Sequence, residues 1–415
     1  MTTTTTPPFA VRTRETLEML ESSGQLKQLQ TLDSPMGATV TMIDDDGSKH
    51  QRICMCSNNY LGLANHPDVV EAGIEALRQY GAGTASVRFI CGTFAPHLTL
   101  EDTIANYMGT EASYTFVSCW NATEALFPTC CEAGDVIISD ELNHACIIDS
   151  MRLTPVIKKG VKKGVFKHSD MDSARQALEK AKNDPEITGQ IWLITDGVFS
   201  MEGDIADLPG LRKLCDEYNA LLVVDDSHGH GVMGKTGRGT HEHYGMCPGT
   251  PDFNEANGVV DVFTGTLGKA LGGGAGGFIA GSKDLVELII QRGRPTLFSN
   301  ALPVTVAASA NAAITTLMNE PQRVQKLRDV TTYARKSLAA AGFEVLESPT
   351  AICPIIVGDT AKAIAMSKKL LEHGIFVIGF GFPVVPEGTA RLRIQMSAAH
   401  ENEHVDQLVE ALKKL

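Results

Sequence analysis

The chain has 415 residues, of which 43% are hydrophobic and 20% charged, a composition that excludes a peptide, a collagen-like chain and a disordered chain. Its 36 basic and 49 acidic residues give a net charge of −13, which opposes binding to nucleic acids and to anionic membranes. No segment reaches the roughly 18 continuous apolar residues of a membrane helix. The ten cysteines include no CxxC pair, so we expect reduced thiols in a cytoplasmic protein.

Residues 1–56 are predicted to form an N-terminal arm. Residues 1–8 are a threonine run ending in two prolines, which we expect to be disordered. Apolar residues at helical spacing predict an amphipathic helix over 12–30. Residues 38–44 and 50–56 then read as two strands on either side of an Asp-Asp-Gly turn.

Residues 57–302 are predicted to form a large α/β domain. Short, continuously apolar runs alternate there with helical patterns, which is typical of a parallel sheet buried on both faces. The predicted strands are 114–117, 136–138, 191–194, 221–224, 259–263 and 278–280.

Residues 303–415 have a different texture and are predicted to form a small α+β domain. The predicted helices are 304–318, 323–341, 360–372 and 403–415, and the predicted strands are 352–357 and 391–395. Together the two domains predict an α/β protein with a mostly parallel sheet.

Ligands of open α/β sheets bind beyond the carboxyl ends of the strands, and three such positions are informative here. Lys269 follows the strand at 259–263 and lies beside glycine residues, where an amine can be desolvated and form a Schiff base. Taken alone it could equally be a solvated loop lysine. However, Asp225 ends another strand and suits a pyridinium nitrogen, while the helix start after Ser118 offers N–H groups to a phosphate. The combination predicts pyridoxal phosphate.

Ordered motifs along the chain carry a resemblance to a known family. They are SNNYLGL at 57–63, ASVRFICGT at 85–93, LNHA at 142–145, DGVFSM at 196–201, DDSH at 225–228, TLGK at 266–269 and QMSAAH at 395–400. Over residues 50–415 the chain resembles the α-oxoamine synthases, and among them the glycine C-acetyltransferases. The resemblance implies the fold-type I, aspartate aminotransferase-like architecture and a homodimer with active sites at the subunit interface. It also implies condensation of glycine with an acyl-CoA, acetyl-CoA foremost, to a 2-amino-3-oxo acid and CoA.

The resemblance further implies roles for individual residues. Lys269 would form the Schiff base and move the α-proton, Asp225 would pair with the pyridinium nitrogen, and His144 would stack on the ring. His228 would contact the phenolic oxygen and polarise the thioester carbonyl. The other implied contacts are Ser200 to the phenolic oxygen, Cys119, Trp120, Thr266 and Ser299 of the partner subunit to the phosphate, and Asn58 and Arg393 to the amino-acid carboxylate. No metal is implied.

Several of these residues also have ordinary structural interpretations. His144 could cap a helix, Ser200 could shape a turn, and Arg393 could be one of two solvated arginines on a strand. The GxGxxG pattern at 229–234 is not followed by a helix, and His400 of the HExxH pattern at 400–404 falls at a helix start, so neither a dinucleotide site nor a zinc site is expected. The lysine run at 158–163 reads as a solvated loop.

The substrates stay open at this point. Trp120, His230 and an apparent insertion at 247–258 depart from the family pattern. The alternatives are therefore another α-oxoamine synthase with a different amino acid or acyl thioester, and a pyridoxal enzyme that only cleaves threonine. A non-catalytic binding protein is disfavoured, because Lys269, Asp225 and His228 are all present.

Overall fold

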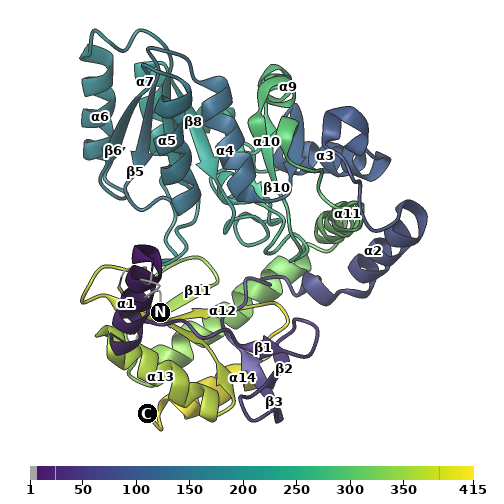
Figure 1. The fold of residues 1–415 in the computed structure, drawn as a ribbon, viewed down its shortest axis with the longest axis vertical. Coiled ribbons are helices and arrows are strands. Elements are labelled where there is room, and N and C mark those ends of the chain that lie inside the picture. The colour runs from purple at the N-terminus through teal and green to yellow at the C-terminus, as the bar shows by residue number, and fades with distance from the viewer. Residues whose placement is uncertain (1–6, 24, 383) are drawn as a thin grey trace, which may run out of the picture.

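The computed structural model describes residues 7–23, 25–382 and 384–415. A large part is built around a seven-stranded sheet, and a smaller part holds two small sheets and the C-terminal helices (Figure 1). The strands of the large sheet, in spatial order, are β4 (Ala112–Phe116), β10 (Gly277–Gly281), β9 (Val262–Thr266), β8 (Ala220–Asp225), β7 (Ile191–Asp196), β5 (Val136–Asp140) and β6 (Lys162–Phe166).

The large sheet is mostly parallel, as predicted, with one exception. Strand β10 runs antiparallel to both of its neighbours, β4 and β9. All six predicted strands of this sheet are present, but the prediction that residues 158–163 form only a loop is wrong, because β6 begins at Lys162. As an edge strand, β6 leaves Lys163 and Val165 exposed on one face, while Lys162 on the other face pairs with Asp184 and Glu186, so its sequence contains no continuous apolar run.

Helices cover both faces of the sheet because successive strand residues point to opposite sides. Ile137, Ile194 and Val223 pack in one cluster, while Ile138 and Leu193 pack in the other. Helices α4 (Cys119–Cys130), α5 (Ala145–Ile157) and α9 (Lys283–Arg292) cover the first face. The second face is covered by α3 (Ala95–Met108), α6 (Met171–Asn183), α7 (Leu208–Tyr218) and α11 (Val304–Asn319). The remaining helices of this part are α2 (Pro67–Tyr80), α8 (Thr240–His243) and α10 (Arg294–Phe298).

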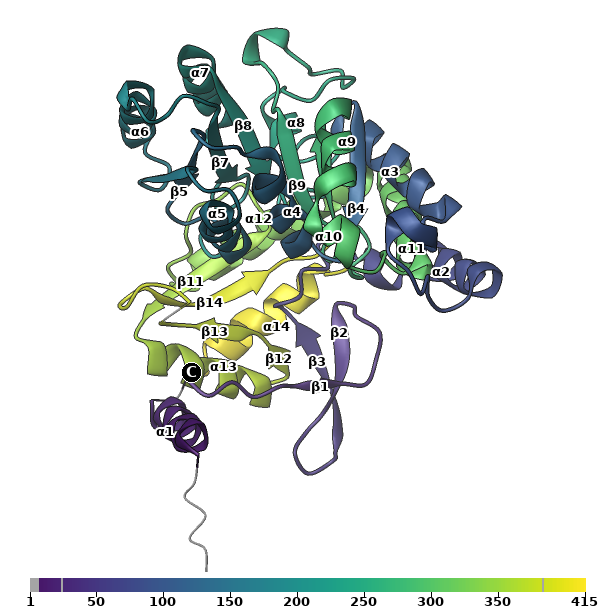
Figure 2. The same ribbon diagram turned by 45° about the horizontal axis from the view of Figure 1, so that its top comes forward.

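The C-terminal segment has the predicted α+β texture. Helices α12 (Gln322–Ala340), α13 (Thr360–Glu372) and α14 (Asn402–Leu412) accompany an antiparallel sheet of β11 (Ile352–Gly358), β14 (Ala390–Gln395) and β13 (Ile378–Phe380). Figure 2 shows β14 between the large sheet and α13. Because α11 packs on α2 and α3 of the large part, the domain boundaries at 56/57 and 302/303 stay predictions.

The N-terminal strands join the C-terminal segment in a second small sheet. Its order is β1 (Thr31–Leu32), β2 (Thr39–Ile43), β3 (Lys49–Cys54) and β12 (Ile375–Phe376), with β12 parallel to β3. The predicted hairpin of β2 and β3 is confirmed.

Helix α1 (Pro8–Ser22) begins and ends earlier than the predicted helix over 12–30. Proline suits a first helical turn, so α1 begins within the predicted disordered run. The remainder of that prediction, residues 1–6, lies outside the described residues. No helix in the described part of the chain is both long and apolar enough to cross a membrane.

An ion cluster ties the end of β5 to the loops beyond β6 and β7. His168 Nδ1 lies 3.1 Å from Asp140 Oδ1, and its Nε2 lies 2.9 Å from Asp204 Oδ2. Burial alone would lower the pKa of His168, but the two carboxylates outweigh it and raise the pKa to about 10. The charged imidazolium therefore stabilises the folded chain.

We predict that His168→Gln lowers the free energy of unfolding more at pH 6 than at pH 10. Because the folded-state pKa lies above the ordinary value, the stabilisation is complete below about pH 6.5 and is lost as the pH rises through about 10. Urea unfolding at both pH values measures the difference. The exposed His373→Gln serves as the control, and an equal loss at both pH values would contradict the ion cluster.

Candidate active site

A cavity of about 240 Å³ lies at the carboxyl ends of β7, β8 and β9, beside the starts of α4 and α5. Most of the residues predicted to form the site line it. The lining residues are Cys119, Trp120, His144, Cys146, Asp196, Val198, Asp225, Ser227, His228, Thr266 and Lys269. Parallel strands bring these positions together although they span 150 residues of sequence, from Cys119 to Lys269.

Lys269 extends from the loop after β9 into this cavity. Its amine makes no hydrogen bond or ion pair with any residue that the structure describes, and Asp225 acts on it only through charge. Burial lowers the pKa of Lys269, against the opposing effect of the nearby carboxylates. A desolvated amine with no partner is suited to forming a Schiff base.

Asp225 and Asp226 have different surroundings at the end of β8. The Asp225 carboxylate accepts the Ser227 N–H at 3.0 Å and the Cys119 thiol at 3.5 Å, and it lines the cavity. Asp226 instead accepts the N–H and the hydroxyl of Thr240, at 2.6 and 2.7 Å. Asp225 is thus available to a ligand, whereas Asp226 anchors the loop that follows.

The start of α4 forms an anion cradle. The Ser118 hydroxyl caps the helix by accepting the Asn121 N–H at 3.2 Å, while the N–H groups of Cys119 and Trp120 have no acceptor among the described residues. Free N–H groups at a helix N-terminus bind phosphate. A Cβ on Gly277 would lie 2.3 Å from the Cys119 nitrogen, so only glycine lets β10 pack there.

The residues of this cavity therefore fit pyridoxal phosphate. The unpartnered amine of Lys269, the accessible carboxylate of Asp225 and the N–H groups of the α4 cradle match the aldehyde, the ring nitrogen and the phosphate of that cofactor.

The helix-cap interpretation of His144 is confirmed, while its stacking on the cofactor ring stays a prediction. His144 is the N-cap residue of α5, where its Nδ1 accepts the Cys146 N–H at 3.2 Å. Its ring also lines the cavity, edge to face with Trp120 at a centroid distance of 6.3 Å. The capping bond fixes the plane of the ring toward the cavity.

Asp196 and Asn143 are among the residues of the site that were not assigned a role from the sequence. Asp196 ends β7 in the wall of the cavity, and burial raises its pKa well above the ordinary value. Asn143 binds the end of β7 by accepting the Asp196 N–H at 2.7 Å and donating to the Ile194 carbonyl at 2.9 Å, and it donates to the Ser139 hydroxyl of β5 at 2.8 Å. Asp196 lies in the DGVFSM motif and Asn143 lies in the LNHA motif. Their positions beyond the ends of predicted strands were the signal that could have identified them as site residues.

The two residues predicted to bind a carboxylate, Asn58 and Arg393, are not among the lining residues of the cavity and meet at Gln395. Arg393 Nη2 donates to Gln395 Oε1 at 3.2 Å, and Gln395 Nε2 donates to Asn58 Oδ1 at 2.6 Å. Arg393 also donates to the Ser200 carbonyl at 2.9 Å, so the backbone of Ser200 holds the guanidinium. The interpretation of two solvated arginines is wrong, because Arg391 is buried and pairs with Glu202 at 3.1 Å, while Arg393 is half-buried.

Ser299 follows α10 and lies outside the cavity, beside Asn121 and Phe298. Its predicted contact belongs to the partner subunit's site and stays a prediction.

His400 is buried outside α14, where it accepts the Ser397 N–H at 3.0 Å and donates to the Cys54 carbonyl at 3.0 Å. Both of its ring nitrogens are therefore engaged within the fold.

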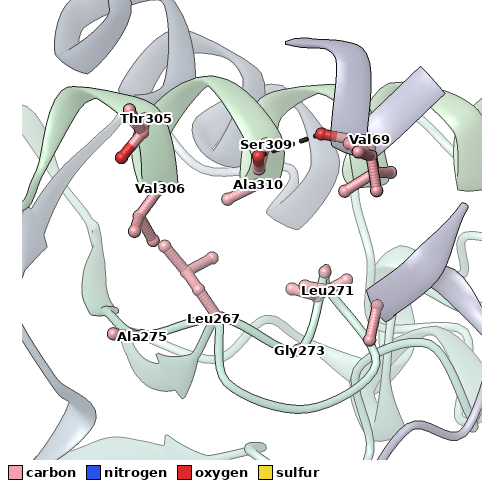
Figure 3. Close-up of a pocket in the computed structure, with 13 residues that line it drawn as sticks. Val69, Leu267, Leu271, Gly273, Ala275, Thr305, Val306, Ser309 and Ala310 are labelled. Carbon is pink, nitrogen blue, oxygen red and sulfur yellow. Dashed lines mark hydrogen bonds between the residues drawn. The ribbon is translucent and has the colours of Figure 1, made fainter. Parts of the chain in front are cut away.

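A second cavity lies on the other side of the loop that carries Lys269. It measures about 230 Å³ and is largely apolar, with Leu267, Leu271 and Val306 pointing into it (Figure 3). Ser309 on α11 donates to the Val69 carbonyl of α2 at 2.9 Å across its rim. The Lys269 loop thus separates two cavities.

Comparison with known proteins adds independent information. The model of the protein family described as aminotransferase class I and II matches residues 51–412 of this chain. An 8-amino-7-oxononanoate synthase of Alkaliphilus metalliredigens is 41% identical over 402 residues, covering 97% of this chain and 96% of that protein. A 2-amino-3-ketobutyrate coenzyme A ligase of Escherichia coli is 41% identical over 399 residues, covering 96% and 95%.

A solved structure of serine palmitoyltransferase with pyridoxal phosphate is 25% identical and superposes with a TM-score of 0.87, covering 99% of this chain and 98% of that one. The fold-type I architecture and the pyridoxal phosphate cofactor that the sequence predicts are confirmed.

We predict that Gly277→Ala weakens binding of pyridoxal phosphate by at least about tenfold, because the new Cβ pushes the start of α4 away from β10. Titration of the cofactor-free protein, followed by visible absorbance, measures the affinity. Gly164→Ala is the matched control, since its nearest neighbour would lie 3.5 Å away. Wild-type affinity in Gly277→Ala would refute the α4 cradle.

Proposed function

The chain belongs to the aminotransferase class I and II family, and on that basis we propose that it condenses glycine with an acyl-CoA, acetyl-CoA foremost, to a 2-amino-3-oxo acid and CoA. With acetyl-CoA the product is 2-amino-3-oxobutyrate. The chain is a pyridoxal-phosphate enzyme of the α-oxoamine synthase type. The observation that carries the choice of glycine and acetyl is the near full-length similarity to a 2-amino-3-ketobutyrate coenzyme A ligase. The compound in that name, 2-amino-3-ketobutyrate, has a four-carbon skeleton that corresponds to glycine joined to an acetyl group.

The cofactor, when bound, supplies an electron sink for the carbanion at the amino-acid α-carbon. Lys269 Nζ is proposed to hold it and to remove the α-proton, and burial, which lowers the pKa of this amine, favours the neutral form that a base requires. Asp225 would pair with the ring nitrogen and keep it protonated, and His144 would stack on the ring. The N–H groups of Cys119 and Trp120, with Thr266, hold the phosphate.

Substrate binding is assigned to residues around the same cavity. Arg393 offers its planar fork to the amino-acid carboxylate, with Asn58 beside it. His228 lines the cavity and polarises the thioester carbonyl as charge develops on its oxygen. The wall residue Asp196, whose pKa is raised by burial, lies next to the ring-facing His144.

The second candidate is a sister reaction with a different amino acid or a longer acyl thioester. The 8-amino-7-oxononanoate synthase of Alkaliphilus metalliredigens, which is just as similar, favours it. A panel of amino acids and acyl-CoAs, followed by thiol release, decides between the two. Turnover of threonine without CoA would instead support aldol cleavage.

We further propose a homodimer in which Ser299 of the partner subunit reaches the phosphate. Phe298, next to Ser299, is 72% exposed, and Ile90 is 68% exposed. A bridge between Val87 and Asn300 brings their two segments together. An apolar patch of this kind beside a proposed interfacial residue is typical of a surface that a second copy covers.

We predict that Lys269→Ala abolishes glycine-dependent CoA release and removes the absorbance change on borohydride reduction, because no amine remains to form the Schiff base. Thiol titration and visible spectra measure the two effects. Lys283→Ala, on the exposed start of α9, is the control. Full CoA release by Lys269→Ala would contradict the assignment.

We predict that Ile90→Asp shifts the protein from dimer to monomer and lowers cofactor affinity, because a charge in the apolar patch opposes its burial. Sedimentation velocity and cofactor titration measure both effects. Val165→Asp places the same change at a position on edge strand β6 that is 62% exposed, and serves as control. A monomeric wild type would refute the proposed dimer.

A further inference from the structure

A chain of hydrogen bonds runs behind His228, on the side away from the cavity. The Tyr60 hydroxyl lies 2.8 Å from His228 Nδ1, and Gln395 Nε2 donates to the same hydroxyl at 2.7 Å. Tyr60 lies in the loop after β3, His228 lies in the loop after β8, and Gln395 is the last residue of β14. Tyr60 is completely buried and Gln395 is 1% exposed, so solvent does not compete for these bonds.

The orientation of the Gln395 amide follows from its neighbours. A guanidinium can only donate, so the oxygen of Gln395 must face Arg393 Nη2 at 3.2 Å. The NH₂ group then faces Asn58 Oδ1 at 2.6 Å and the Tyr60 hydroxyl at 2.7 Å. Arg393 therefore determines that Gln395 is a donor toward Tyr60.

The direction of the next bond follows in the same way. The Tyr60 hydroxyl accepts from Gln395, and its own proton has one acceptor among the described residues, His228 Nδ1. A buried O–H without an acceptor is costly, so this proton points at Nδ1. A neutral imidazole that accepts at Nδ1 carries its proton on Nε2.

We propose that Tyr60 and Gln395 are positioning residues that hold the proton of His228 on Nε2, so that an N–H donor faces the cavity. This inference rests on the proposed function of His228 at that cavity. A fixed donor is what an oxygen acquiring negative charge in the reaction requires, since it needs no reorientation. Burial, with the charges of Lys269 and Arg393, lowers the pKa of His228 well below the ordinary value and keeps the ring neutral.

The experiment is ¹⁵N NMR of full-length protein labelled at histidine, as holoenzyme and after removal of the cofactor. Wild-type His228 should be the Nε2–H tautomer in both samples. Gln395→Glu replaces the donor by an acceptor that the neighbouring Arg393 keeps ionised, so the Tyr60 proton turns away from His228. We expect this variant to move the His228 proton to Nδ1. Tyr60→Phe removes the donor without changing the ring, and should mix the two tautomers in the cofactor-free protein.

Tyr107→Phe is the matched control, because it removes an equally buried hydroxyl whose proton goes to the Gly237 carbonyl. It should leave the His228 signals unchanged. Tyr60→Phe should also lower kcat by about tenfold with little change in the KM for glycine, which separates positioning from carboxylate binding. A His228 that remains wholly Nε2–H in Gln395→Glu or in cofactor-free Tyr60→Phe would overturn the proposal.

Failure of the proposed function has a different signature. If wild-type protein released no CoA with glycine, the proposed substrates would be wrong. The NMR samples contain no substrate. The tautomer measured in them would therefore still decide whether Tyr60 and Gln395 hold the proton of His228 on Nε2.

Discussion

The structure of the site depends on one constraint, that the amine of Lys269 is buried without a partner. A protein that only required stability would pair or expose such an amine, because an isolated buried charge is costly. Here the charges of Asp225 and Asp196 act on the amine at a distance, and neither forms an ion pair with it in the described chain. The two neighbouring strands β8 and β9 separate Asp225 from Lys269. Strand β8 ends at Asp225, which pairs with Thr264, whereas β9 continues beyond Thr264 toward Lys269. Pyridoxal phosphate is proposed to bind between Asp225 and Lys269.

The local charge arrangement explains how a chain with a net charge of −13 binds anionic partners. The cradle at α4 offers dipoles, and Arg393 is held by a carbonyl and an amide oxygen, with no carboxylate hydrogen-bonded to it among the described residues. A guanidinium held by neutral acceptors keeps its charge available to a substrate. By contrast, Arg391 on the same strand is paired with Glu202. Of these two arginines, which are separated by one residue, Arg391 is structural, whereas Arg393 is the one proposed to bind a substrate carboxylate.

The sequence predicted the parts of the site that follow local rules. Apolar runs located the strands, and the polar residues after them located Lys269 and Asp225, because ligand position in such sheets depends on strand ends. The reversed direction of β10 was not predictable, since an apolar run of five residues reads the same in both directions. The edge strand β6 was missed because it begins with two lysines and contains no continuous apolar run. The contacts of Gln395 with Asn58 and Tyr60 join residues more than 330 positions apart, which no local pattern encodes.

The pairing of β12 with β3 has a consequence for how the chain is made. Ile375 lies opposite Ile53, so the edge of β3 has no partner until nearly the whole polypeptide has left the ribosome. Asn58 and Tyr60 likewise lack a hydrogen-bond donor until Gln395 has been synthesised. Contacts of such high sequence separation form late in folding, and an open strand edge is exposed to other chains in the meantime. The two small sheets therefore cannot be completed until all seven strands of the large sheet, the last of which ends at Gly281, have been synthesised.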